Sequence, residues 1–128
     1  MDSDLCTFCN TEKETLEHLF YDCYVTKHFL SDFCDWVLTK LNLHLGLSKQ
    51  NVLFGIPLNK SNRTVNWILL HLKKIIYFNR TKNSSPSFVA FRRYMEGEIN
   101  VQKFLLLKNG KFNEYNNLWK PWLEALAE

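Results

Sequence analysis

Apolar residues recur three or four positions apart in three long segments of this chain, residues 23–42, 62–82 and 87–108. This spacing predicts amphipathic α-helices, because it gathers the apolar side chains on one face of each helix. In the first segment that face consists of Val25, Phe29, Phe33, Trp36, Val37 and Leu41. In the second, which begins at Asn62 or Thr64, it consists of Ile68, Leu69, Leu72, Ile75 and Ile76. In the third it consists of Phe88, Phe91, Met95, Ile99, Leu105 and Leu106.

Shorter helices are predicted at residues 14–21, 48–54 and 113–126. Ser48 and Ser87 are suitable N-caps, because a serine hydroxyl accepts a hydrogen bond from a free N–H of the first turn. The expected helix stops are Gly46, Gly55 and Gly110. We expect Pro121 to bend the last helix, since proline lacks a backbone N–H. The polar segment 57–63 predicts a loop, and strand patterns are weak throughout.

The composition is that of a folded domain with few turns. Hydrophobic residues make up 46% of the 128 positions, which is enough for one compact core. Only 4 Gly and 3 Pro are present, which argues against a turn-rich sandwich or barrel. No apolar run approaches the roughly 18 residues that a membrane helix needs. The acidic start at residues 1–4 differs from a secretory signal, so the 4 cysteines indicate a reducing compartment, cytoplasm or nucleus.

Charge is distributed unevenly between the two halves of the chain. Residues 1–62 carry 5 Lys/Arg and 8 Asp/Glu, whereas residues 63–128 carry 11 and 5. Ten basic residues lie between Arg63 and Lys111, with only Glu96 and Glu98 against them. An acidic, cysteine-bearing front half is thus joined to a basic, helical back half. Such asymmetry indicates contact with nucleic acid.

Four residues near the start of the chain have the spacing of a metal site. Cys6, Cys9, His18 and Cys23 form the pattern C-x2-C-x8-H-x4-C. A C-x2-C turn lets two thiolates reach one zinc ion at roughly 2.3 Å, and the other two ligands would come from the helical hairpin that follows. Three thiolates and one imidazole leave no open position, so we expect one structural Zn²⁺ and no catalytic role for it.

Two alternatives to this site remain open. Cys6 and Cys9 could be a redox pair of thiols, although the strand and helix that normally flank such a pair are not evident. His28, which also follows Cys23 after four intervening residues, could replace His18 as the fourth ligand. Cys34 lies on the apolar face near Phe33 and is expected to be a buried free thiol.

The segment CTFCNTEKETLEHLFYDC, residues 6–23, resembles the zinc-binding region at the C-terminal end of reverse transcriptases from LINE-type (non-LTR) retrotransposons. In that family a C-x2-C pair precedes an E-T-x-x-H-L-F-x-x-C block. The matching positions here are Glu14, Thr15, His18, Leu19, Phe20 and Cys23. Tyr24 stands where the family often has proline. Residues 51–56, 66–80 and 119–122 match the tails of such proteins more loosely.

The resemblance implies a C-terminal segment of a longer polyprotein, with the polymerase and endonuclease domains upstream. It implies binding of the element's own RNA, and of target DNA as a second candidate, during target-primed reverse transcription. A membrane or a small-molecule substrate is not expected as a partner.

The basic helices offer their own candidate contacts for phosphates. These are Lys73, Lys74, Arg80, Lys82, Arg92, Arg93 and Lys103. Basic side chains interleaved with aromatic rings suit single-stranded RNA. The alternative is that these charges only keep the helix exteriors solvated. The aromatic residues Trp36, Trp67, Phe91, Phe104 and Trp119 are expected in the core rather than as platforms for bases.

The sequence therefore predicts a mainly α fold, a zinc-stapled helical hairpin packed on a small helical bundle. Residues 1–47 would form the zinc-binding unit and residues 48–128 the basic helical part, packed together as one compact domain. The expected function is a non-catalytic, RNA-binding domain of a LINE-type polyprotein. The alternative is a protein-interaction module that caps the polymerase without touching RNA.

Overall fold

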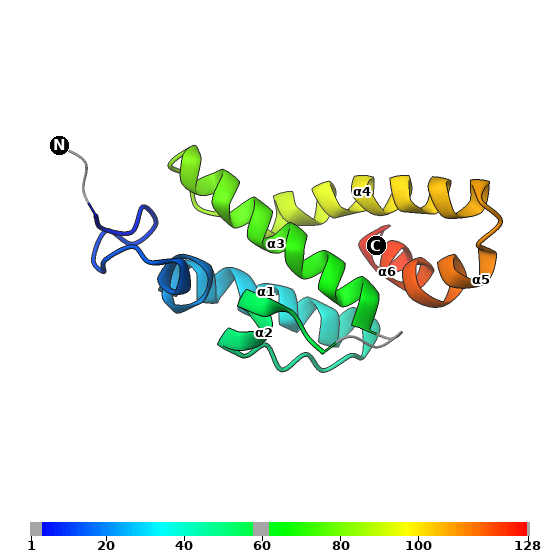
Figure 1. The fold of residues 1–128 in the computed structure, drawn as a ribbon, viewed down its shortest axis with the longest axis horizontal. Helices are drawn as coiled ribbons and strands as arrows, with labels where there is room; N and C mark the ends of the chain where they lie inside the picture. The colour runs from blue at the N-terminus through cyan, green and yellow to red at the C-terminus, as the bar shows by residue number, and fades with distance from the viewer. Residues whose placement is uncertain (1–3, 58–61, 128) are drawn as a thin grey trace.

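The computed structural model describes residues 4–57 and 62–127, and these are mainly helical (Figure 1). Within the described residues the only extended pairing is an isolated antiparallel bridge between Leu5 and Lys13. The prediction of a mainly α fold is therefore confirmed. Residues 58–61, which belong to the predicted loop, lie outside the described part of the chain. No helix among the described residues is both long and apolar enough to span a bilayer.

The helices lie close to where the apolar periodicity predicts them. Their bounds are η1 His18–Asp22, α1 Tyr24–Leu41, α2 Lys49–Phe54, α3 Arg63–Thr81, α4 Phe88–Lys108, α5 Phe112–Glu114, η3 Tyr115–Trp119 and α6 Lys120–Ala127. Both expected serine caps are confirmed: the Ser48 hydroxyl accepts from Asn51 N at 3.1 Å, and that of Ser87 from Ala90 N at 3.3 Å. Short-range capping chemistry thus fixes the start of α2 and of α4.

The end of α1 agrees with the predicted segment 23–42. The helix ends at Leu41, and its C-cap is Asn42, which has the left-handed φ of 51°, so Gly46 is not needed to stop it. Asparagine tolerates this conformation because its short polar side chain can hydrogen-bond locally. Residues 43–47 then run to α2 without regular structure.

Two π-helical turns, η1 and η3, each have a carbonyl that accepts a hydrogen bond from a buried threonine of another helix. Thr26 on α1 donates to Leu19 O at 2.6 Å, and Thr64 on α3 donates to Leu118 O at 2.8 Å. Both threonines are at most 1% exposed. A π-turn shifts the backbone hydrogen bonds by one residue, so an outside donor to its carbonyls stabilises it. The η3 turn ends at Trp119, two residues before Pro121, near which a bend is predicted.

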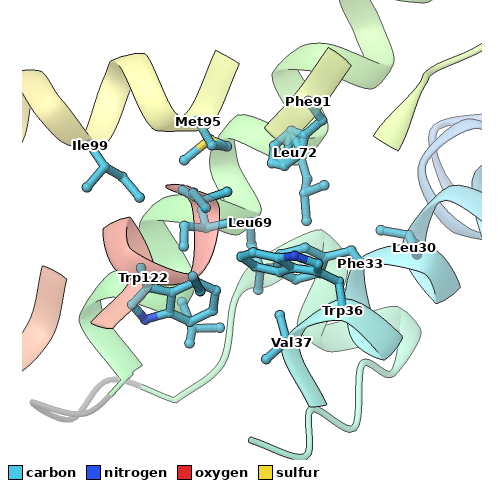
Figure 2. Packing of buried hydrophobic residues seen from close by; sticks show 14 of the residues in the cluster. Leu30, Phe33, Trp36, Val37, Leu69, Leu72, Phe91, Met95, Ile99 and Trp122 are labelled. Atoms are coloured by element: carbon cyan, nitrogen blue, oxygen red, sulfur yellow. The ribbon is translucent and has the colours of Figure 1, made fainter. Parts of the chain in front are cut away.

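The core lies where α1, α3, α4 and α6 meet (Figure 2). Phe33 of α1 stacks on Trp122 of α6, with ring centroids 6.5 Å apart and an interplanar angle of 14°. Phe91 of α4 meets Phe33 edge-on at 6.2 Å. Since both predicted parts of the chain supply these residues, one continuous hydrophobic cluster joins them.

Three expectations about burial need correction. Leu105 is 44% exposed and Phe104 is 65% exposed, so neither belongs to the core. Both lie in the last part of α4, where the side chains that pack against the core are instead Leu106 and Leu107. Cys34 is a free thiol but only half-buried, and burial raises its pKa.

Candidate metal centre and basic surface

Backbone hydrogen bonds shape the segment that carries Cys6 and Cys9 into a tight turn. Cys6 N donates to Glu12 O and Asn10 N donates to Cys6 O, each at 2.8 Å. Asn10 has a φ of 57°, which closes the turn directly after Cys9. The turn directs both cysteine side chains inwards, where Cys6 is 0% and Cys9 is 8% exposed.

His18 and Cys23 are positioned by the π-turn η1. Thr15 caps this helical segment, because its hydroxyl accepts a hydrogen bond from His18 N at 3.0 Å. At the other end Cys23 N donates to His18 O at 2.8 Å, so His18 and Cys23 are one π-turn apart. Such turns are frequent at functional sites. Here the turn brings the side chains of His18 and Cys23 against those of Cys6 and Cys9.

The four side chains converge on one point. The sulfurs of Cys6 and Cys23 are 3.8 Å apart, and Cys9 Sγ is 3.3 Å from His18 Nε2. All four ligand atoms lie within 4.8 Å of one another. A tetrahedral ion bound at about 2.3 Å by sulfur and about 2.0 Å by nitrogen needs S–S and S–N separations of about 3.8 and 3.5 Å. The geometry therefore fits one metal ion held by three sulfurs and one nitrogen.

Local hydrogen bonds favour the thiolate form of Cys9. Burial alone raises the pKa of this thiol, but hydrogen bonds from the side chain and N–H of Thr11 outweigh it, helped by Glu12 N–H and His18. The result is a pKa of about 5. Burial and the adjacent Cys6 thiol instead raise the pKa of Cys23 to about 11. A cation bound between the sulfurs would lower the pKa of Cys23 again, because it would stabilise the thiolate form of each cysteine ligand.

His28, the alternative fourth ligand, lies elsewhere. Its side chain is 77% exposed, and Nδ1 is 3.5 Å from the carboxylate of Asp32 one turn further along α1. His18 rather than His28 thus joins the cysteines. The C-x2-C pair is also not isolated, as a redox pair of thiols would be, because it contacts Cys23 and His18.

An ion pair joins the metal-site turn to α3. Arg80 Nε donates to Glu14 Oε1 at 2.9 Å, and its Nη2 donates to Oε2 at 2.6 Å. The hydrogen bonds from Arg80 hold the pKa of Glu14 below its usual value. On the other side of the site, Lys49 of α2 pairs with Asp22 at 2.9 Å. Two acidic residues around the cluster are therefore paired with basic residues of the helical part.

The seven predicted phosphate contacts do not form one surface. Arg80 is engaged by Glu14, and Lys73 Nζ donates to Leu53 O in the last turn of α2 at 3.1 Å. Both side chains therefore hold the fold together. Asn66, on the same side of α3, donates to Ile56 O and accepts from Ile56 N. Much of the polar face of α3 is thus an internal contact.

The remaining five lie on the outer sides of α3 and α4. Lys82 Nζ is 4.4 Å from the ring of Phe78, and Lys74 Nζ is 5.9 Å from that of Tyr94. Arg92, half-buried with its guanidinium 5.5 Å from the Trp36 ring, lines a hollow with the exposed Arg93. Further along α4, Lys103 Nζ is 5.7 Å from the ring of Tyr115.

Sequence reasoning missed two of the exposed aromatic rings beside cations, Phe78 and Phe104. Phe78 is 50% exposed at the end of α3, next to Tyr77, which is 52% exposed and which the helical period does place on the polar side. The exposure of Phe104 could have been predicted from the helical period. Phe104 lies on the opposite side of α4 from Met95 and Ile99, which are buried.

The chain was compared with protein-family models, with curated proteins and with solved structures, and none of these matches it.

Proposed function

We propose that this chain is a structural-zinc, nucleic-acid-binding domain of the kind that ends LINE-type reverse transcriptases. The observation that carries the binding part of the proposal is the contact of exposed lysines with exposed rings. Lys82 lies 4.4 Å from Phe78, which is half exposed itself and follows the equally exposed Tyr77. Rings that stack on unpaired bases and cations that meet phosphates are the components of single-strand recognition.

Zinc is the metal that the donor set favours. Soft thiolates together with imidazole in a tetrahedral arrangement suit Zn²⁺ better than hard cations, which prefer oxygen. Cys6 and Cys23 are fully buried, and the three sulfurs and one nitrogen supply the four ligands that a tetrahedral zinc site takes. A closed site of this type stabilises the fold and does not activate water. The proposed role of the ion is therefore to brace the turn against α1 and α3.

The residues that resemble the LINE-type motif have clear local roles. Thr15 caps the segment that carries His18, and Glu14 pairs with Arg80. Leu19 is 3% exposed in the main core, and Phe20 packs against the same cluster. Each specified residue of the E-T-x-x-H-L-F block thus helps to position the metal site or to attach it to the helices. This supports the view that the motif specifies a zinc-bound hairpin docked on basic helices.

The proposal is tested by titrating a fluorescent single-stranded RNA with the zinc-loaded protein at several salt concentrations. Five basic residues remain for phosphates once Lys73 and Arg80 are set aside. About five neutralised phosphates on a single strand give a log–log slope of about −3 to −4. Binding that is absent at low salt, or that does not change with salt, would overturn the proposal.

Single substitutions of basic residues test which side chains contact the RNA in the same titration. Arg93→Ala and Lys82→Ala should each weaken binding and reduce the slope by about 0.7. Lys27→Ala, an exposed lysine on α1, serves as the matched control and should leave both unchanged. Arg92 is a poorer choice, because its side chain packs over Trp36 and its removal costs packing as well as charge.

A protein-interaction module is the second candidate, and one surface favours it. Phe54 is 84% and Leu70 is 62% exposed, and both line a hollow between α2 and α3. If this surface carries the function, Phe54→Ser should abolish capture of the upstream polymerase, while Arg93→Ala should leave that capture intact.

A further inference from the structure

The last part of α4 exposes a phenylalanine beside lysines. Phe104 is 65% exposed, and Lys108 Nζ, one turn further along, is 5.9 Å from the centre of its ring. Lys103, the residue before it, has its ammonium 5.7 Å from the ring of Tyr115. A single exposed apolar side chain is common on protein surfaces, so the lysines beside the ring are what distinguish Phe104.

A hollow on the surface connects these side chains. It is lined by Asn100, Lys103, Phe104, Leu107 and Lys108. The lining holds two cationic groups and no acidic group. Glu96, one turn before Asn100 on α4, lines a separate hollow with Arg92 and Arg93. The hollow therefore suits a partner that is both anionic and flat.

We propose that Phe104 is a stacking platform for an unpaired nucleobase, with Lys103 and Lys108 contacting the phosphates on either side of it. The inference deepens the proposed function and rests on it, since it assigns one base-binding position within the nucleic-acid surface. A cation 5.9 Å from a ring is at the outer limit of a cation–π contact. Lys108 can therefore turn to a phosphate at small cost and leave the ring free for a base.

A single strand fits this surface better than a duplex does. In a duplex the base faces are stacked on each other, so an aromatic ring reaches them only after a base is extruded. The chemistry is shared by single-stranded RNA and DNA, because both present flat bases along a chain of phosphates. Discrimination between them depends on the 2′-hydroxyl, which a comparison of matched strands detects.

The test uses the full zinc-loaded chain and three fluorescent probes of equal length. These are a single-stranded RNA, the matching single-stranded DNA, and an abasic DNA strand that keeps the phosphates. Phe104→Leu should weaken binding of the strands that carry bases by about 5-fold or more, since base–aromatic stacking contributes a factor of about 5 to 150. It should leave the affinity for the abasic strand and the salt slope unchanged.

Two companion variants separate charge from stacking. Lys108→Gln should reduce the salt slope by about 0.7 with all three probes, because it removes a phosphate contact. Val101→Ala removes another exposed apolar side chain of α4, outside the hollow, and should bind like wild type. Circular dichroism of each variant checks that the helices are retained, as expected for exposed positions.

The outcomes distinguish a failure of the stacking inference from a failure of the proposed function. If wild type binds RNA with the expected salt slope but Phe104→Leu binds equally well, the stacking inference fails and the proposed function stands. An equal loss of affinity for the abasic strand would also overturn stacking. If wild type binds none of the probes at low salt, the proposed function fails and the inference falls with it.

Discussion

The Glu14–Arg80 pair offers a quantitative test of how the metal-site turn is held to the bundle. The two side chains are 66 positions apart in sequence and make two hydrogen bonds, of 2.9 and 2.6 Å. The Glu14 side chain is 18% exposed and that of Arg80 is 35%. We consider Glu14→Gln, Arg80→Gln and the double variant, which preserve most of the volume while removing the charges.

The coupling energy follows from this geometry. Exposed ion pairs contribute about 0.2–1 kcal/mol, whereas hydrogen bonds to charged groups that are shielded from solvent contribute about 1.5–3 kcal/mol. Because Glu14 is mostly buried while Arg80 is about one-third exposed, solvent screens the pair only in part. The double-mutant cycle should therefore give a coupling of about 1–2 kcal/mol that decreases in high salt.

Two measurements on the zinc-loaded protein report this coupling. Urea unfolding reports the global free energy. Amide exchange of Cys6 N–H and Glu14 N–H, which are bonded to Glu12 O and Asp4 O, reports opening of the turn alone. A coupling below about 0.3 kcal/mol by both measurements would refute the reasoning, because it would leave the bidentate contact without energetic effect.

The Glu14–Arg80 pair makes the free energy of unfolding depend on pH in a definite direction. Since Arg80 holds the pKa of Glu14 below its usual value, the folded state keeps the carboxylate charged at lower pH than the unfolded state does. The stabilisation is therefore complete above the unfolded pKa of about 4.3 and is lost as pH falls through the lower folded value. Wild type and Glu14→Gln should converge in stability over that range, and a difference that widens on acidification would contradict the assignment.

Three further predictions concern the metal, a helix cap and the core. Metal analysis should find one zinc per chain in wild type and none in Cys23→Ser. Removal of the metal by a chelator should open the turn at residues 6–12 but leave the main thermal unfolding transition of the helices, because the buried cysteines form a cluster separate from the main core. Ser87→Ala should lower the free energy of unfolding by about 1 kcal/mol in urea titrations, since it removes the cap of α4, whereas Ser85→Ala should change it by less than about 0.5 kcal/mol. Phe91→Ala should cost about 3–5 kcal/mol because the side chain is 2% exposed, while Phe104→Ala should cost little.

Local chemistry explains why much of the fold and the metal site could be predicted from the sequence. The period of apolar residues sets each long helix, and Ser48 and Ser87 fix where two helices begin. The ligand spacing needs only a turn and one short helical segment, so the cluster forms within 18 residues of sequence, from Cys6 to Cys23. The π-turn that joins His18 to Cys23 was not predictable in this way. It receives a hydrogen bond from Thr26, which depends on how α1 packs.

The partners of polar side chains could not be predicted, because they depend on contacts distant in sequence. The helical period correctly groups Asn66, Lys73 and Arg80 on one side of α3, but it cannot tell solvent from a neighbouring element. Lys73 instead caps α2 through Leu53 O, as only the packing of α2 on α3 reveals. Phe104 was misjudged for a related reason. Aromatic residues are usually buried, and that tendency was given more weight than the position of Phe104 on the helix.

These internal contacts change what the charge asymmetry means. The sequence separates an acidic front half from a basic back half, and that separation alone indicates a basic surface for an anionic partner. In the structure, part of the asymmetry joins the halves: Glu14 engages Arg80, and Asp22 engages Lys49. The positive charge left for a partner is therefore smaller than the sequence count, and it lies on the outer sides of α3 and α4. Exposed rings accompany that remaining charge, at Phe78 beside Lys82 and at Phe104 beside Lys108, and this combination is why we propose a single-stranded nucleic acid rather than an anionic partner of any shape.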